Sequence, residues 1–210
     1  MEPDPRAVLL LAHGAGAGMA HPFLRDIARA LAARQVATVR WEFPYMRAGK
    51  PRPDPAPVAE AAVRAAWQAM RAQFGDAVPL FAGGKSFGGR MTSRAHAAAP
   101  LDGLCGIVFL GFPLHPPERP GIERAEHLAH ATGPLLFLQG TRDALADLAL
   151  LHPVVDALGP RATLHVVDGA DHGFDVLVRS GRTRADVIAE LADTIVAWMD
   201  QVIAKLPERR

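Results

Sequence analysis

Length, composition and charge predict one ordinary globular domain over residues 1–210. The chain has 210 residues, of which 50% are hydrophobic and 21% are charged, and its formal net charge is +1. A chain of this length builds one well-packed core and is short for two. The nearly balanced charge excludes the strongly basic composition of many nucleic-acid-binding proteins, and we expect no nucleic-acid partner.

The apolar segments and the cysteine content bear on location. No apolar stretch has the length of a membrane-spanning helix, and residues 1–6 are acidic and proline-rich rather than leader-like. Cys105 is the only cysteine, which excludes an internal disulfide, and we expect it to be a small buried side chain in a strand. These features predict a cytoplasmic protein with no membrane partner.

Short apolar runs alternate with longer amphipathic stretches along the chain, which is typical of an α/β fold. The strands are expected at Ala7–Ala12, Ala37–Phe43, Val78–Ala82, Gly106–Leu110, Leu135–Gln139 and Thr163–Val167. The helices are expected at Pro22–Arg34, Pro57–Phe74, Gly88–Ala98, Ile122–Ala129, Ala146–Leu158 and Thr183–Leu206. This order predicts a doubly wound, mostly parallel sheet of about six strands, with the first and third strands as neighbours.

The segment Gly84-Lys85-Ser86-Phe87-Gly88 predicts a nucleophile elbow between a strand and a helix. Glycines two positions before and after Ser86 allow the sharp turn that exposes a serine hydroxyl. Ser86 would then lie at a helix N-terminus, where free N–H groups stabilise an oxyanion. An ordinary strand-to-helix turn is the alternative interpretation.

A second glycine cluster, His13-Gly14-Ala15-Gly16-Ala17-Gly18, follows the first expected strand. Glycines at such a position leave backbone N–H groups that can face an oxyanion, and the residue after the nucleophile supplies the other donor. We expect Ala15 and Phe87 to be these donors, with Gly16 as the alternative to Ala15. Gly14 and Gly16 are expected to line the substrate site.

Two phosphate-binding interpretations use the same glycines. Gly84-Lys85-Ser86 resembles the end of a P-loop, but Pro79 stands where that motif requires glycine. The first cluster resembles a dinucleotide fingerprint, with Glu42 after the next strand as a ribose-binding acid. The last glycine of that fingerprint falls on Met19 or His21, so a nucleotide site stays a minor alternative and we expect no cofactor.

A serine nucleophile needs a base within hydrogen-bond reach and a third group that orients the base. Of the nine histidines, His172 is the one in a loop between a late strand and the final helix. Asp143 directly follows the fifth expected strand. Ser86, Asp143 and His172 are therefore predicted to meet at one edge of the sheet as nucleophile, acid and base.

Neighbouring acids have other interpretations. Asp143 would alternatively cap the helix that follows it, and Asp147 is a rival acid one helical turn later. Asp171 is adjacent to His172 and is poorly placed to bond its ring, so we expect it to support a turn.

The remaining histidines are expected to be surface or packed polar residues. His13 is expected to shape the glycine loop, whereas His115 lies in a loop at the active-site edge and is expected to touch substrate. The sequence contains no H-E-x-x-H pair and no cysteine cluster, so we expect no metal site.

A proline-rich loop over residues 45–57 carries Arg47, Lys50 and Arg52 and is expected at the same edge. One hypothesis is that this basic loop favours acyl groups that bear a carboxylate. The plainer interpretation is a solvated surface loop.

Taken together, the motifs resemble the α/β-hydrolase superfamily, and most closely its small, uncapped dienelactone-hydrolase-like and Tex30/KANL3-like branch. The resemblance rests on His13-Gly14-Ala15-Gly16, on residues 83–90 and 111–117, and on Gly140-Thr141-Arg142-Asp143 and Gly169-Ala170-Asp171-His172. It implies a serine hydrolase with Ser86, Asp143 and His172 as triad and an oxyanion site at the first glycine loop and Phe87.

Two details limit what the resemblance implies. Dienelactone hydrolases use a cysteine nucleophile, so Ser86 argues against carrying their substrate over. The segment between Gly111 and Gly133 is too short for a helical cap, which predicts an open site and small or exposed acyl substrates. The sequence thus predicts a carboxylesterase-like hydrolase of esters or thioesters; the alternative is a non-catalytic hydrolase-fold module that binds proteins.

Overall fold

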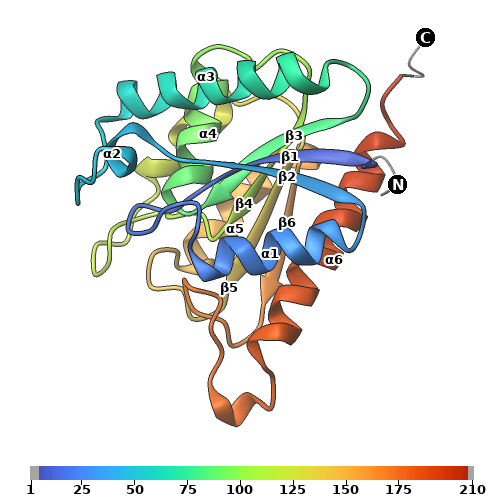
Figure 1. Ribbon diagram of the computed structural model, residues 1–210. Helices are drawn as coiled ribbons and strands as arrows, with labels where there is room; N and C mark the ends of the chain where they lie inside the picture. The colour runs from blue at the N-terminus through green and yellow to red at the C-terminus, as the bar shows by residue number, and fades with distance from the viewer. Residues whose placement is uncertain (1–4, 208–210) are drawn as a thin grey trace.

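A six-stranded parallel sheet in the order β2-β1-β3-β4-β5-β6 organises the computed structural model, which describes residues 5–207 (Figure 1). The strands are β1 (Ala7–Ala12), β2 (Val36–Trp41), β3 (Leu80–Lys85), β4 (Leu104–Leu110), β5 (Leu135–Gly140) and β6 (Ala162–Val167). The predicted doubly wound sheet is confirmed, including the adjacency of the first and third strands.

Helices cover both faces of this sheet. The α-helices are α1 (Pro22–Ala32), α2 (Pro44–Arg47), α3 (Ala56–Phe74), α4 (Phe87–Ala98), α5 (Leu148–Ala157) and α6 (Arg184–Ile203). The 3-10 helices are η1 (Glu123–Ala129), η2 (Gly159–Arg161) and η3 (Val178–Ser180). Figure 1 shows α3 and α4 on one side of the sheet and α1 and α6 on the other. None of the helices within residues 5–207 combines the length and apolar character needed to cross a membrane.

The core follows from alternation along strands that are covered on both faces. Every residue of β1 is buried. Leu9 and Leu11 pack with α1 and α6, whereas Val8 and Leu10 pack with α3 and α4. A strand buried on both faces needs a continuous apolar run, and this is why β1 was recognisable in the sequence.

Three local expectations need correction. The third strand, expected to end at Ala82, continues to Lys85 because Gly83 and Gly84 pair with Val108 and Phe109 of β4. The segment expected as an α-helix near residues 122–129 is the 3-10 helix η1, and the short α2 was not predicted. Cys105 lies in β4 as expected but is only partly buried.

Parallel pairing of β1 with β3 brings the glycine loop and the serine turn together. Ala12, the last residue of β1, is in register with Gly84. A Cβ on Gly84 would lie 2.4 Å from the carbonyl oxygen of Ala12, and one on Gly88 would lie 2.5 Å from that of His13. Only glycine allows this contact, so the start of α4 packs directly on the end of β1.

We predict that Gly88→Ala destabilises the protein, although alanine usually stabilises a helix by about 0.5–1 kcal/mol relative to glycine. The new methyl group would meet backbone, and overpacking of this kind costs about 1–3 kcal/mol. Urea unfolding gives the free-energy difference. Gly16→Ala is the control, because a Cβ there meets nothing within 4 Å and should change stability little. Equal stability of the two variants would contradict the prediction.

Candidate active site

Ser86 occupies a strained turn between β3 and α4. Its backbone has φ 49° and ψ −115°, a conformation in which a residue with a Cβ is costly. The N–H of Ser86 donates to the carbonyl oxygen of Leu110 at 3.0 Å, which ties the turn to the end of β4. The strain is therefore held by the surrounding strands, and the hydroxyl projects from the carboxyl edge of the sheet.

A chain of hydrogen bonds joins Ser86, His172 and Asp143. Nε2 of His172 lies 2.9 Å from Oγ of Ser86, and Nδ1 lies 2.7 Å from Oδ2 of Asp143. A carboxylate only accepts hydrogen bonds, so Nδ1 carries the proton and Nε2 is free to accept one from the serine. The three residues follow β3, β6 and β5. The structure thus brings together the side chains that the sequence analysis selected.

The carboxylate of Asp143 is completely buried and is held at both oxygens. Oδ1 accepts from the N–H of Leu145 at 2.8 Å, and Oδ2 accepts from Nε2 of Gln139 as well as from His172. Gln139 is itself buried, and its Oε1 accepts from the N–H of Phe112 at 2.9 Å. A buried charge is stable only with such partners, so Gln139 fixes the position of the acid. Sequence reasoning missed Gln139, which looks like the end of an apolar strand.

The loop that carries His172 is held close to the end of β5. A Cβ on Gly140 would lie 2.2 Å from the carbonyl oxygen of Ala170, so glycine is required at this approach. Oδ1 of Asp171 accepts from the N–H groups of Gly173 at 2.8 Å and Asp175 at 3.0 Å. Asp171 therefore supports the turn, as expected.

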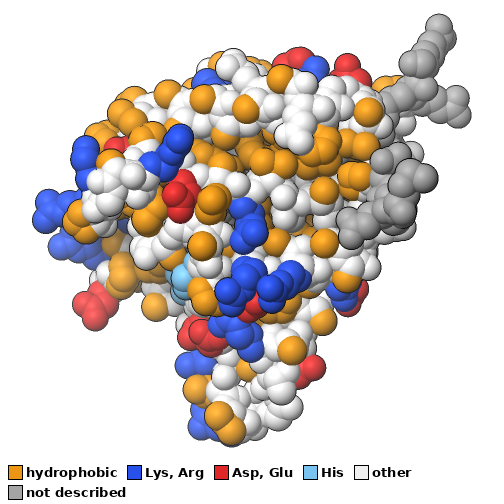
Figure 2. Space-filling view, in the orientation of Figure 1, with side chains coloured by type: hydrophobic (Ala, Val, Ile, Leu, Met, Phe, Trp, Pro, Cys, Tyr) orange, Lys and Arg blue, Asp and Glu red, His pale blue; other side chains and the backbone are white. Residues whose placement is uncertain are grey.

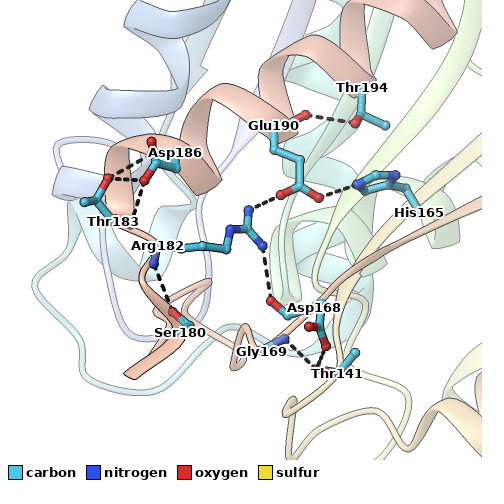
Figure 3. Close-up of polar contacts among 10 residues, drawn as sticks. All are labelled: Thr141, His165, Asp168, Gly169, Ser180, Arg182, Thr183, Asp186, Glu190 and Thr194. Carbon is cyan, nitrogen blue, oxygen red and sulfur yellow. Dashed lines mark hydrogen bonds and ion pairs between the residues drawn. The ribbon is translucent and has the colours of Figure 1, made fainter. Parts of the chain in front are cut away.

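A polar network anchors the same loop to its neighbours (Figure 3). Arg182 donates to the carbonyl oxygen of Asp168 at 3.2 Å and pairs with Glu190 on α6. Thr141, after β5, accepts at Oγ1 from the N–H of Gly169 at 2.8 Å. The loop that carries His172 is thereby connected to both β5 and α6, although it has no regular secondary structure.

The predicted oxyanion donors lie on the two loops that meet at Ser86. A Cβ on Gly14 would lie 3.9 Å from Cβ of Ser86, and Ala15 and Gly16 line the cavity beside the serine. Phe87 is the first residue of α4, where helix geometry gives its N–H no acceptor. Backbone donors of this kind suit a developing negative charge.

Side chains hold the glycine loop in shape. The hydroxyl of Tyr45 donates to the carbonyl oxygen of Ala15 at 2.8 Å, a contact that sequence reasoning missed. Nε2 of His13 accepts from the N–H of Phe43 at 3.1 Å, and Nδ1 lies 2.7 Å from the carbonyl oxygen of Gly14. Burial lowers the pKa of His13, so it is a neutral support of the loop.

The side chain of His115 does not reach the cavity at Ser86, contrary to our expectation that it touches substrate. It is 5% exposed and does not line the cavity at Ser86. Nδ1 donates to the carbonyl oxygen of Pro116 at 2.9 Å, and Nε2 accepts from the N–H of Asp147 at 3.0 Å. Both nitrogens are thus occupied by backbone, which makes His115 a loop support. Asp147 caps α5 by accepting from Ala149.

The cationic residues Arg47, Lys50 and Arg52 are exposed around α2 and do not line the cavity at Ser86. Figure 2 shows Lys and Arg side chains on this part of the surface. Arg47 lines a different hollow, together with Trp41 and Glu42. Their positions match the plainer interpretation, a solvated surface loop.

The cavity beside Ser86 has a volume of about 420 Å³. It is lined by the small residues Gly14–Ala17, by the larger side chains Phe23 and Leu24 of α1, and by Lys85 and Leu145. No cap domain covers it within residues 5–207. In the same range no group of His, Cys, Asp and Glu residues is arranged to hold a metal ion.

Comparisons with known proteins agree with this architecture. Residues 5–200 match the model of an alpha/beta hydrolase domain family. A dienelactone hydrolase from Anabaena variabilis is 20% identical, with a TM-score of 0.73 over 94% of this chain and 87% of that one. A lidless α/β serine hydrolase from Xanthomonas campestris is also 20% identical, with a TM-score of 0.69 over 93% and 84%.

A third similar structure is Est1E from Butyrivibrio proteoclasticus with bound ferulic acid. It is 16% identical, with a TM-score of 0.67 over 98% of this chain and 92% of that one. The structural likenesses establish the fold, and the family match covers nearly the whole chain. The protein therefore belongs to the alpha/beta hydrolase domain family, and its fold is similar to those of a dienelactone hydrolase and of a serine hydrolase without a lid.

Proposed function

We propose that the protein is a serine hydrolase that cleaves carboxylic ester bonds of small or exposed acyl substrates. Ser86 is the nucleophile, His172 the base and Asp143 the group that orients the base. The observation that carries the proposal is the unbroken hydrogen-bond chain from Asp143 Oδ2 to Nδ1, and from Nε2 to Ser86 Oγ, at 2.7 and 2.9 Å. That geometry supports proton removal from the serine as it attacks.

In the acylation half of the reaction, Oγ of Ser86 attacks the ester carbonyl while its proton moves to Nε2 of His172. The carbonyl oxygen becomes an oxyanion, which the N–H groups of Ala15 and Phe87 stabilise. Collapse of this intermediate breaks the bond to the alcohol, and His172 returns the proton to the leaving oxygen. The acyl group remains on Ser86.

Water completes the cycle. It attacks the acyl carbonyl and gives a proton to Nε2 of His172, and the second tetrahedral intermediate releases the carboxylic acid as that proton returns to Oγ of Ser86. The open cavity lets water enter. The cavity volume of about 420 Å³ favours short acyl groups, or the exposed acyl end of a larger molecule. A thioester would react by the same steps.

A non-catalytic hydrolase-fold module is the competing hypothesis. A backbone such as that of Ser86 costs about 1–3 kcal/mol, and the buried carboxylate of Asp143 also needs dedicated partners. A protein-binding module has no physical need for either feature. Both therefore favour the enzyme.

We predict covalent labelling of Ser86 by a fluorophosphonate probe and hydrolysis of p-nitrophenyl acetate. Ser86→Ala should abolish labelling and lower turnover on the order of 1,000-fold or more, because the nucleophile is absent. Mass spectrometry of the labelled peptide identifies the site. A folded wild-type protein that is neither labelled nor active would support the non-catalytic module.

Ser93→Ala is the matched control. Oγ of Ser93 also contacts an imidazole, Nε2 of His127 at 2.7 Å, but the residue is fully buried. Burial and the charges of Arg94 and Arg90 lower the pKa of His127 to about 4. This pair lies outside the cavity, so labelling and turnover should persist. If Ser93→Ala lost labelling and Ser86→Ala kept it, the assignment of Ser86 as the reactive serine would be wrong.

We predict that Asp143→Asn lowers kcat by about 10³- to 10⁴-fold, because an amide no longer holds the required imidazole tautomer. Asp147→Asn should remain close to wild type in kcat, since Asp147 only caps α5. Steady-state kinetics on the same ester compares the two. The reverse order of effects would make Asp147 the orienting acid.

A further inference from the structure

Lys85 precedes the nucleophile and has a buried ammonium group that the reaction steps above do not use. Nζ donates to the backbone carbonyl oxygen of His172. It lies 5.3 Å from the ring centroid of Phe174 and 6.0 Å from that of Phe23, and these two rings stack on each other at 5.5 Å. The charge is therefore held by one carbonyl and by two aromatic faces.

The same ammonium lies beside the acid and the base. A Cβ placed on Gly111 would be 3.0 Å from Nζ of Lys85 and 3.5 Å from both Oδ2 of Asp143 and Cε1 of His172. All three groups thus surround one point at the end of β4. The stem of Lys85 approaches the glycine loop, because a Cβ on Gly14 would lie 3.6 Å from its Cγ.

Keeping a charge in this place has a cost. Burial lowers the pKa of Lys85 to about 8, against the opposing effect of Asp143 and Asp171. A methionine would fill similar space with no desolvation of an ammonium. The polar contact with the backbone of His172 is what a methionine could not make.

We propose that Lys85 is a positioning residue for the base, whose ammonium holds the backbone of His172 so that the imidazole spans Asp143 and Ser86. The inference rests on the proposed function, since it gives His172 the role of base. The proposal adds Lys85, the residue directly before Ser86, as a group that holds His172 in position.

The charge state of Lys85 makes the proposal testable by pH. The facing groups are Asp143 after β5 and Asp171 and His172 after β6, all near the ammonium. His21, which caps the N-terminus of α1, lines the same cavity, and Cζ of Arg184 on α6 lies 6.0 Å from the ring centroid of Phe23. Lys85 is charged below its pKa of about 8 and neutral above it, so the contact weakens as pH rises through that value. Wild-type kcat should therefore fall on the alkaline side.

The first test is Lys85→Met, with Lys205→Met as control on an exposed residue near the end of α6. We expect Lys85→Met to lose about 100-fold in kcat with little change in KM, because a base displaced by about 1 Å loses that much. The variant should also lack the alkaline fall. Loss of packing alone would not remove a titration, so an alkaline fall retained in Lys85→Met would overturn the proposal, as would unchanged kcat.

Lys85→Arg provides the rescue. A guanidinium stays charged up to about pH 12 and keeps a donor, so kcat should exceed that of Lys85→Met and should show no fall near pH 8. If arginine and methionine behave alike in both respects, the charge has no positioning role. Thermal unfolding of each variant establishes that the folded protein is being compared.

A measurement that does not depend on turnover tests the positioning role of Lys85 separately from the proposed hydrolytic function. A proton on Nδ1 that is shared with a buried carboxylate gives a low-field proton NMR resonance, which we expect in wild type and Lys205→Met and not in Lys85→Met. Persistence of that resonance in Lys85→Met would overturn the positioning role. Failure of the probe and ester assays in wild type, with the resonance lost in Lys85→Met, would instead refute the hydrolytic function and leave the structural contact established.

Discussion

The arrangement of the site depends on the hydrogen bonds that the buried carboxylate of Asp143 accepts. Its side chain is 0% exposed, so each oxygen must find donors within the protein. The donors are Gln139 near the end of β5, Leu145 in the loop after β5 and His172 in the loop after β6. Satisfying this charge therefore fixes the loop after β5, the imidazole and, through Nε2, the direction in which the hydroxyl of Ser86 points.

Parallel topology explains why residues so distant along the chain can satisfy one another. All six strands run in the same direction, so the loops that follow β1, β3, β5 and β6 share one edge. Close backbone approach then sets their separation. Gly84 and Gly88 lie against the end of β1, and Gly140 lies against the base loop at Ala170, where a side chain would collide with backbone. Glycines at these close approaches thus set the distances between the loops that carry Ser86, Asp143 and His172.

The sequence predicted the parts of this arrangement that depend on local pattern. Buried strands read as apolar runs, and the turn at Ser86 showed itself by glycines at fixed spacing. Gln139 and Lys85 gave no such signal, because each acts through a partner that only the folded sheet brings near. His115 was misplaced for a related reason: its position at the correct edge was evident, but the direction of its side chain depends on contacts with Pro116 and Asp147.

Two serine–histidine contacts in one fold show how much the surroundings matter. Ser93 and His127 approach each other more closely than Ser86 and His172, at 2.7 Å against 2.9 Å. Burial and neighbouring arginine charges lower the pKa of His127 and so disfavour its charged form, and Ser93 is fully buried. His172 instead has a carboxylate on its far nitrogen, an open cavity beside its near one and a cation holding its backbone. A short contact between the two side chain types is therefore not enough for chemistry; the imidazole must also be able to carry charge where a substrate can reach.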